Sequence, residues 1–344
     1  MGIDALDAES SRTKAGFGFL GTTRGVLVLI GPFLGLIAVS ALFAFLTRDS
    51  GSFLTAYNWR TIAVQTVIVG TAALGMTVVM IGGGIDLSVG SAVALVTVAI
   101  AVLVRDAGMA VPLAMVCGVA IGGACGLLNG GLITGLGVVP FIITLGGLKV
   151  YRGLAKWLSS STAVYIPGDS KPWWFGKLLA IEPRPDWLIV APGVWLLLGL
   201  SVLVALGLRY SVLGRYFYAV GSNEATSRLC GINVPGVKLA IYGLAGLATG
   251  LAGVLQFLYL DGTGDPTTAD GLELQVIAGV VIGGGSLAGG EGTVLGTLIG
   301  CLFMSVLNNG CVHAGISNAS QDVIIGSIIV AAVTLDRIRR GRRV

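Results

Sequence analysis

The chain has 344 residues, of which 55% are hydrophobic and only 11% are charged, and its mean hydropathy is +0.92. A soluble domain usually carries about 25% charged residues, so this chain has too little polar surface for water and is expected in a lipid bilayer. The net charge of +4 is modest, and no basic patch interleaved with aromatic residues points to nucleic-acid binding.

The first 24 residues form a polar segment that mixes acidic and basic side chains and has no apolar run before Gly25. This pattern predicts a cytoplasmic N-terminal tail followed by a spanning helix, rather than a cleaved signal peptide. Residues 25–336 are predicted to be the transmembrane domain. Residues 337–344, with five arginines, are predicted to be a basic cytoplasmic tail.

A helix needs about 20 apolar residues to cross the hydrocarbon core, and this rule predicts an all-α transmembrane bundle of about ten spans. The predicted spans are residues 25–46, 61–81, 85–104, 110–132, 138–158, 187–208, 237–260, 272–289, 292–309 and 321–336. The fifth contains Lys149, Arg152 and Lys156, and the eighth ends in the three glycines of 283–285. Short or glycine-interrupted segments are typical of discontinuous helices that line a cavity, so some broken helices are expected.

Ten spans place both termini on one side of the membrane, and basic residues favour the cytoplasmic side. The arginines of 337–344 and the basic 209–238 connection then lie inside, while the acidic 261–273 connection lies outside. The 149–186 stretch, with six basic residues, opposes the rule, so 12 basic residues lie inside against 9 outside. We expect a multi-pass protein of the inner (plasma) membrane with both termini in the cytoplasm.

Two predicted spans carry glycines at every fourth position, which places the glycines on one helix face. They are Gly118, Gly122, Gly126 and Gly130 in the fourth span and Gly292, Gly296 and Gly300 in the ninth. Such stripes let helix backbones approach closely. Because the two spans lie five apart and run in opposite directions, they indicate an inverted repeat of spans two to five with seven to ten. The match of 81–84 with 282–285, six spans apart, indicates a parallel repeat instead, and both alternatives stay open.

The sequence contains no recognisable catalytic or metal-binding arrangement. His313 is the only histidine, and the five cysteines stand in or near apolar runs without metal-ligand spacing. No lysine completes a phosphate-binding Gly-x-x-x-x-Gly-Lys-[Ser/Thr] loop. ATP is therefore expected to bind a separate chain, and this chain is expected to be neither an enzyme nor a cofactor-binding protein.

The strongest local signal lies between the second and third spans. It reads Gly82-Gly83-Gly84-Ile85-Asp86-Leu87-Ser88-Val89-Gly90-Ser91. A charge flanked by apolar spans is costly and is usually paired or functional. Either Asp86 and Ser88 cap the helix that follows the glycine break, or they form part of a substrate path or its gate.

This decapeptide resembles the Gly-Gly-Ile-Asp-Leu-Ser-Val-Gly signature of the monosaccharide (ribose, xylose, galactose) ABC permeases, in the superfamily that includes the branched-chain amino acid permeases. Further matches follow in the family's order, at residues 139–146 with 151–153, at 221–232 and at 283–290. The resemblance covers roughly residues 55–335. It implies the membrane-spanning permease subunit of a binding-protein-dependent ABC importer.

The resemblance also implies that the 209–238 connection docks on the ATPase, although composition alone describes it equally well as a linker. The matching residues are Gly221, Ser222, Asn223, Ala225, Thr226, Ser227, Arg228, Gly231 and Ile232. Thr226 and Ser227 replace two alanines that are usual in the family, and both are small enough for a cleft. Glu224 and Arg228 are four residues apart and are predicted to pair on a short helix.

A neutral sugar needs hydrogen-bond donors and acceptors rather than fixed charge, so polar residues at membrane depth are the candidates for the substrate pathway. The predicted pathway residues are Asp86, Ser88, Asn129, Thr144, Glu273, Gln275, Asn308 and Asn309. Hydrogen bonding between helices accounts equally well for any one of them.

These observations favour a monosaccharide permease that forms the translocation pathway. Its expected partners are ABC ATPase subunits, a periplasmic or extracellular sugar-binding protein, and a second permease in a homodimer or heterodimer. One alternative is an importer of branched-chain amino acids or another small solute, in which Asp86, Lys149 and Arg152 would hold a zwitterion. Another is an ion-coupled secondary transporter, for which several intramembrane acids are expected. A scaffold without transport has only the glycine packing in its favour.

Overall fold

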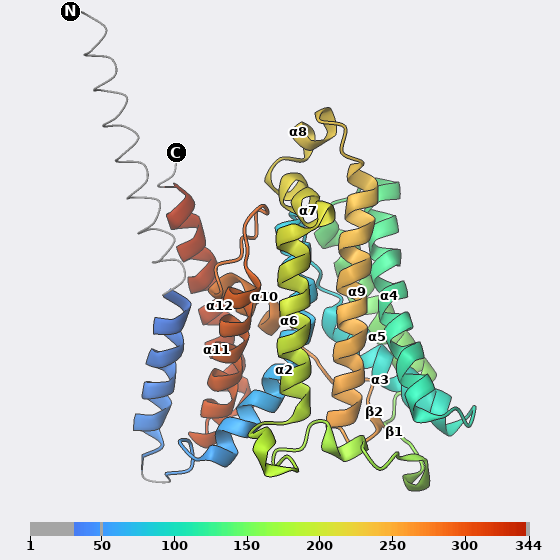
Figure 1. Ribbon diagram of the computed structural model, residues 1–344, viewed down its shortest axis with the longest axis vertical. Coiled ribbons are helices and arrows are strands. Elements are labelled where there is room, and N and C mark those ends of the chain that lie inside the picture. The colour runs from blue at the N-terminus through green and yellow to red at the C-terminus, as the bar shows by residue number, and fades with distance from the viewer. Residues whose placement is uncertain (1–30, 49–50, 342–344) are drawn as a thin grey trace, which may run out of the picture.

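The computed structural model describes residues 31–48 and 51–341 and is almost entirely helical (Figure 1). A first helix is described over Gly31–Leu46. It is followed by α2 (Ala56–Ile81), α3 (Val89–Arg105), α4 (Val111–Leu136), α5 (Pro140–Leu158), α6 (Pro192–Tyr210), α7 (Val212–Ser222), α8 (Glu224–Leu229), α9 (Val234–Tyr259), α10 (Leu272–Ile282), α11 (Val294–His313) and α12 (Asn318–Gly341). The predicted tail 1–24 and residues 342–344 lie outside the described residues.

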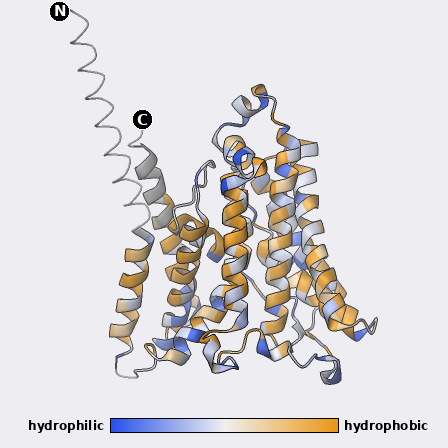
Figure 2. Ribbon diagram, in the orientation of Figure 1, coloured by the Kyte–Doolittle hydropathy of each residue, from blue (hydrophilic) through white to orange (hydrophobic). Residues whose placement is uncertain are grey.

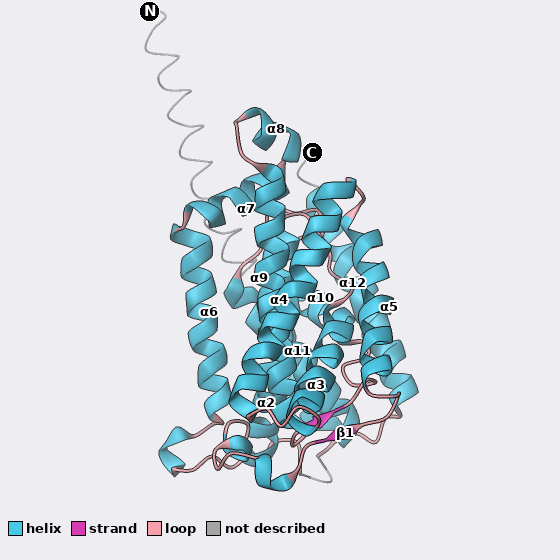
Figure 3. Cartoon of the chain, turned by 90° about the vertical axis from the view of Figure 1, so that its right-hand side faces the viewer, coloured by secondary structure: helices cyan, strands magenta, loops and turns pink. Residues whose placement is uncertain are grey.

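The connection between α5 and α6 holds one short strand and three 3-10 helices, and the strand pairs with a second strand between α9 and α10. These are β1 (Val164–Tyr165), which pairs antiparallel with β2 (Thr263–Gly264), and the 3-10 helices η1 (Gly168–Ser170), η2 (Phe175–Lys177) and η3 (Asp186–Leu188). Figures 1 and 3 show this connection at one end of the bundle and α7 and α8 at the other.

The predicted polytopic helical bundle is confirmed, and each of the ten predicted spans corresponds to one helix. The helices α2, α4, α6, α9 and α11 are long and apolar enough to cross a membrane, and four shorter apolar helices accompany them. Figure 2 shows hydrophobic residues along the helices and hydrophilic residues gathered towards their ends. The fifth span forms a continuous helix, α5, although it contains three basic residues.

The eighth predicted span, 272–289, is wrong in length because α10 ends at Ile282. Gly283 packs so closely on α11 that a Cβ there would overlap the carbonyl oxygen of Gly296, and Gly284 has a left-handed φ of +90°. The chain therefore leaves the helix at 283 and stays non-helical up to α11. At 1.5 Å per residue, the 11 residues of α10 span about 16 Å, or half of the hydrocarbon core.

The structure supports the inverted arrangement of the two halves. In each half a long helix, α2 or α9, is followed by a non-helical break and a shorter helix, α3 or α10. The long helices are antiparallel, since Gly75 lies against Ala245 and Gly82 against Ile241. The pairing of α4 with α9 has its counterpart in the pairing of α11 with α2, where the Thr77 and Thr297 hydroxyls are 2.7 Å apart.

The parallel alternative does not describe this fold. The stretch 81–84 precedes the short helix α3, whereas 282–285 follows the short helix α10. The glycines of 82–84 follow the end of α2, and those of 283–285 follow the end of α10. These two helices point in the same direction, because both pack antiparallel to α11. Their similarity therefore reflects a common end of the bundle and not equivalent positions in a repeat.

The glycine stripes lie where helices approach most closely. On α4, Gly122 meets Gly250 and Gly126 meets Gly246 of α9, and a Cβ at any of these positions would overlap the opposite backbone. On α11, Gly300 packs in the same way against Gly279 of α10. The predicted grooves are thus confirmed, and their partners are α9 and α10.

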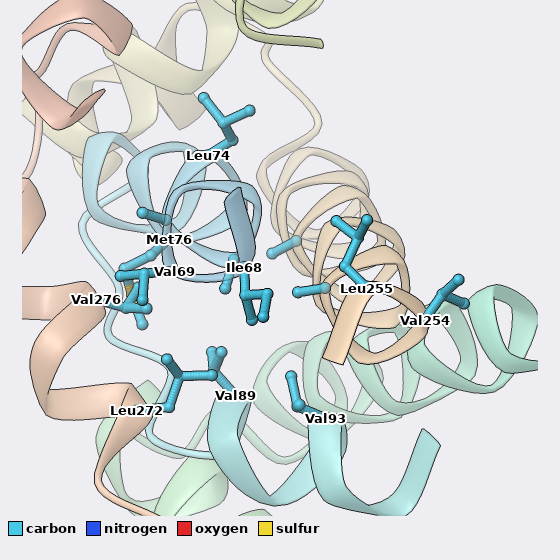
Figure 4. Close-up of a cluster of buried hydrophobic side chains, with 14 of the residues drawn as sticks. Ile68, Val69, Leu74, Met76, Val89, Val93, Val254, Leu255, Leu272 and Val276 are labelled. Carbon is cyan, nitrogen blue, oxygen red and sulfur yellow. The ribbon is translucent and has the colours of Figure 1, made fainter. Parts of the chain in front are cut away.

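The core is centred on α2, whose residues from Ile62 to Ile81 are mostly buried by other helices. Figure 4 shows Ile68 of α2 between Leu255 of α9, Val89 of α3 and residues of α10. Val89 and Leu272, which begin α3 and α10, point toward one another in this view. Gly90 lies against the carbonyl oxygen of Ala269. The two short helices therefore start at the same place inside the bundle.

Candidate functional site

A chain of polar side chains connects the break between α2 and α3 with α4 and α5. One carboxylate oxygen of Asp86 accepts hydrogen bonds from the backbone N–H and the hydroxyl of Ser88, at 2.8 and 2.6 Å. Ser88 Oγ in turn accepts from Asn129 Nδ2 at 2.9 Å, and Asn129 Oδ1 accepts from the Tyr151 hydroxyl at 2.8 Å. We call Asp86, Ser88, Asn129 and Tyr151 the Asp86 network.

The surrounding helices hold this network in place through small residues and one further hydrogen bond. The Thr144 hydroxyl of α5 donates to the carbonyl oxygen of Ile85 at 3.1 Å. A Cβ at Gly147 would lie 3.1 Å from Asn129 Oδ1 and 3.3 Å from Ser88 Cβ, so glycine lets α5 pack on the network. Three predicted pathway residues from separate spans, Asp86, Asn129 and Thr144, are thereby brought together.

The predicted helix cap is not formed. Ser88 occupies the N-cap position of α3 but makes no capping hydrogen bond with its side chain. Asp86 bonds Ser88, two residues later, rather than the first-turn amides of α3. Asp86 is 4% exposed, and no lysine or arginine of the described residues forms an ion pair with it. A buried charge without a cation is costly, which favours the functional hypothesis over the capping one.

The other four predicted pathway residues form a second group on α10 and α11. Asn308 Nδ2 donates to Gln275 Oε1 at 3.2 Å. Glu273 is buried in the first turn of α10 beside Gly90 of α3, and its Oε2 has no hydrogen-bond partner. Asn309 is buried and its Oδ1 also lacks one. No hydrogen bond joins this group to the Asp86 network in the described part of the chain.

Sequence reasoning missed two tyrosines at the site. Tyr151 completes the Asp86 network and also donates to the carbonyl oxygen of Cys125 at 3.0 Å. Tyr242 of α9 places its buried hydroxyl against Gly84, without a hydrogen-bond partner. Tyr151 lies in the stretch 151–153 that resembles the family, but its hydrogen-bond partners are far away along the chain, and no sequence signal marks Tyr242.

The predicted docking connection contains two helices at the end of the bundle opposite β1 and β2 (Figure 1). Gly221 and Ser222 end α7, α8 spans Glu224–Leu229, and Gly231 and Ile232 follow it. The short helix expected between 221 and 232 is therefore confirmed as the six residues of α8. Asn223 Oδ1 caps it by accepting from the Thr226 N–H at 2.9 Å.

Ion pairs stiffen α8 and tie it to α9. Glu224 pairs with Arg228 at 3.1 Å, as predicted, and with Lys238 of α9 at 2.7 Å. The hydrogen bond from Lys238 lowers the pKa of the Glu224 carboxyl below its ordinary value. The tether is therefore present at neutral pH and is lost only when the pH falls through that lowered value.

Two residues of α8 differ in exposure from the predicted ATPase-docking surface. Ser227 is 5% exposed, and its hydroxyl donates to the Asn223 carbonyl, so it faces its own chain. Ala225, Thr226 and Arg228 are exposed, and Leu229 at the end of α8 is 89% exposed. Leu229 is a docking candidate that sequence reasoning missed, although an apolar residue at the end of a polar helix is a usable signal.

Gly221 connects the docking helices to the glycine break. A Cβ at Gly221 would overlap the carbonyl oxygen of Ile81, and the nearest atoms to a Cβ at Gly83 belong to Gly221. Gly290 donates its N–H to the same Ile81 carbonyl at 2.9 Å. We call Ile81, Gly83, Gly221 and Gly290 the glycine junction. A cavity of about 210 Å³ between the glycine break and the start of α8 adjoins it.

No group of three His, Cys, Asp or Glu side chains that could hold a metal ion is found among the described residues. All five cysteines are free thiols, and Cys230 alone among them is exposed. The polar groups described above can donate and accept hydrogen bonds.

Known proteins with similar sequences extend this description. The family described as branched-chain amino acid transport system / permease component matches residues 58–333. The ribose import permease protein RbsC of Escherichia coli K12 is 37% identical over 308 residues, which cover 88% of this chain and 92% of that protein. RbsC of Bacillus subtilis is 38% identical over 91% of this chain and 94% of its own length. The D-allose transport system permease protein AlsC of E. coli K12 is 34% identical over 90% and 91%. No solved structure matches.

Proposed function

This chain belongs to the branched-chain amino acid transport system / permease component family, and from this we propose that it is the membrane-spanning permease subunit of an ABC importer for a monosaccharide. The similarity to permeases named for ribose and D-allose, over nine-tenths of their length, carries the proposal. Their names favour a sugar over the amino acids in the family's description. The protein is a multi-pass membrane protein.

The polar groups inside the bundle suit a neutral, hydroxyl-rich solute. The Asp86 network and the pair of Gln275 with Asn308 offer donors and acceptors without a buried cation. A sugar hydroxyl can replace one of these side-chain hydrogen bonds at little cost in free energy, because hydroxyl and amide groups both donate and accept hydrogen bonds. Asp86, which has no cation partner among the described residues, is our candidate for the group that senses the solute or controls its passage.

The glycine junction supplies a route from the docking helices to this network. In this proposal the ATPase acts on α8, which is joined through Asn223 to α7, whose Gly221 touches both Ile81 and Gly83. Asp86 lies three residues beyond Gly83. Backbone contacts of this kind have no side chain that could absorb a displacement, so a shift of α7 moves the break between α2 and α3.

A permease of an ABC importer works with ATPase and substrate-binding subunits. We infer that ATP is bound by the ATPase chain, that the 209–238 connection and both termini are cytoplasmic, and that the binding protein delivers sugar from the other side. We also infer a second permease, identical or similar, against the exposed face of α5. Gly146 and Gly153 on that face have nothing within 4 Å of a built Cβ, so another helix can approach closely there.

Reconstitution tests the proposed function. Vesicles that contain this chain, its ATPase and its binding protein are expected to take up at least one labelled pentose or hexose, and to require both ATP and the binding protein. Branched-chain amino acids serve as the comparison. Uptake by this chain alone along an ion gradient would replace the proposal with a secondary transporter.

A further inference from the structure

The cavity beside the glycine junction lies at the end of the bundle that carries α7 and α8 (Figure 1). Its volume of about 210 Å³ is several times the roughly 30 Å³ that one water molecule takes up in the liquid. It is smaller than the ~300–1,000 Å³ of pockets for drug-sized ligands. The cavity therefore suits a small solute, in the size class of a single sugar ring.

The cavity extends from the surface of the bundle down to buried side chains. Ala288 at its rim is exposed, whereas Ile241 and Tyr242 on its inner wall are buried. The Tyr242 hydroxyl lies against Gly84, which precedes Asp86 by two residues. The inner wall is thus next to the segment of chain that carries the Asp86 network.

The hydroxyl of Tyr242 is buried and has no hydrogen-bond partner among the described residues. A buried hydroxyl without a partner destabilises the folded state, and a phenylalanine ring would fill the same space without this cost. Tyr218 shows the ordinary arrangement, since its hydroxyl donates to the carbonyl oxygen of Gly292 at 2.9 Å. The Tyr242 hydroxyl therefore indicates a partner that enters the cavity from outside the chain.

The other polar groups of the wall favour a neutral solute that is rich in hydroxyl groups. Glu224 and Lys238 both line the cavity and pair with each other at 2.7 Å, so neither presents an isolated charge to a ligand. Ser222 and Asn223 add a hydroxyl and an amide at the exposed side. Such groups offer both donors and acceptors to sugar hydroxyls, whereas an ionic solute would find no unpaired counter-charge.

We propose that this cavity binds the transported sugar at the end of the permease that carries α7 and α8, and that the Tyr242 hydroxyl forms a hydrogen bond with a sugar hydroxyl there. This rests on the proposed function and adds to it a solute site apart from the Asp86 network. Gly83 and Gly221 of the glycine junction line the cavity. A displacement of α7 by the ATPase would therefore change the shape of the cavity, which suits it to release the sugar.

Equilibrium binding tests the proposal. The full chain in complex with its ATPase, without the binding protein, is placed in nanodiscs and titrated with the labelled sugar that the reconstituted transporter takes up, chosen from ribose, D-allose and galactose. We expect saturable binding. Tyr242→Phe is expected to raise the Kd about tenfold, the effect of one lost hydrogen bond, while the unfolding temperature stays the same or rises because the hydroxyl has no partner in the described part of the chain.

Two further variants provide the control and the location. Tyr218→Phe removes a hydroxyl that already has a partner, so it is expected to lower the unfolding temperature and leave the Kd unchanged. Ala288→Trp places a large ring at the rim of the cavity and is expected to abolish binding. Because Ala288 is exposed, the unfolding temperature of this variant is expected to remain that of the wild type.

The outcomes separate this inference from the proposed function. If the wild-type transporter takes up no monosaccharide, the proposed function fails and this inference with it. If it takes up a sugar that the complex in nanodiscs does not bind, or that Tyr242→Phe or Ala288→Trp binds with the wild-type Kd, the cavity holds water alone and only this inference is overturned. A fall in the unfolding temperature of Tyr242→Phe equal to that of Tyr218→Phe would also overturn it, since the hydroxyl would then have a structural partner.

Discussion

Asp86 receives both of its hydrogen bonds from Ser88, and a neutral amide oxygen can accept the same two bonds. We therefore expect Asp86→Asn to insert and fold with a nearly unchanged unfolding temperature. Its ATP-dependent uptake is expected to fall about tenfold or more if the carboxylate has the role in transport that we propose for it. Uptake in vesicles and thermal unfolding in detergent measure the two effects separately.

The alanine variant is the matched comparison for Asp86. Asp86→Ala removes the acceptor and leaves the buried donors of Ser88 unsatisfied, which is expected to lower the free energy of unfolding by about 1–3 kcal/mol. Should Asp86→Asn transport at the wild-type rate while only Asp86→Ala fails, the role of this carboxylate would be structural.

Gly221 is required by a backbone contact rather than by a turn. An alanine methyl there would overlap the carbonyl oxygen of Ile81, and neither backbone can move without shifting α2 or α7. Gly221→Ala is expected to lower the free energy of unfolding by about 1–3 kcal/mol. It is also expected to reduce ATP-dependent uptake by a larger factor than it reduces binding of the ATPase.

A helical glycine in open surroundings provides the control for Gly221. Gly199 in α6 has nothing within 4 Å of a built Cβ, so Gly199→Ala is expected to be neutral or stabilising by about 0.5–1 kcal/mol. Equal effects of the two substitutions on uptake and unfolding would remove the glycine junction from the proposed route.

At the scale of the element, α8 presents an apolar end to the outside of the chain. Leu229 is 89% exposed, and burying it in an ATPase groove would supply about 1.5–3 kcal/mol of binding free energy. Leu229→Asp is expected to weaken co-purification with the ATPase about tenfold or more, while the chain still inserts and folds. Pull-down from detergent extracts and substrate-stimulated ATP hydrolysis measure the change.

Two further substitutions in α8 sharpen this test. Leu229→Met keeps volume and hydrophobicity and is expected to bind the ATPase normally. Thr226→Trp is expected to overfill the groove, because Thr226 is exposed. Ser227 is less suitable, since a large residue there would disturb its own chain. Normal ATPase binding by both Leu229→Asp and Thr226→Trp would refute the docking assignment.

At the scale of the whole molecule, the native cysteines test the orientation. Cys230 is the exposed cysteine, and it follows α8. An impermeant maleimide is expected to label Cys230 in inside-out vesicles but not in intact cells. In a Cys230→Ser background, Asp261→Cys at the opposite end, beside β2, is expected to show the reverse. Labelling of both positions from one side would contradict the ten-span topology.

Several features of the fold follow from short stretches of sequence. The spans depend on about 20 consecutive apolar residues, the break before α3 on three adjacent glycines, and the Glu224–Arg228 pair on a spacing of four. Each of these was predictable because the residues responsible are neighbours along the chain. The same locality explains why the end of α10 was misjudged: Gly283 terminates that helix through its contact with α11.

Sequence patterns alone thus predict a helical membrane protein, its approximate spans, its broken helices and its resemblance to sugar permeases. The inverted relation of the two halves and the place of Tyr151 in the Asp86 network became visible in the folded chain alone. Asn129 and Ser88 are 41 residues apart. Such contacts depend on how whole helices pack, and packing is set by surfaces that several distant segments build together.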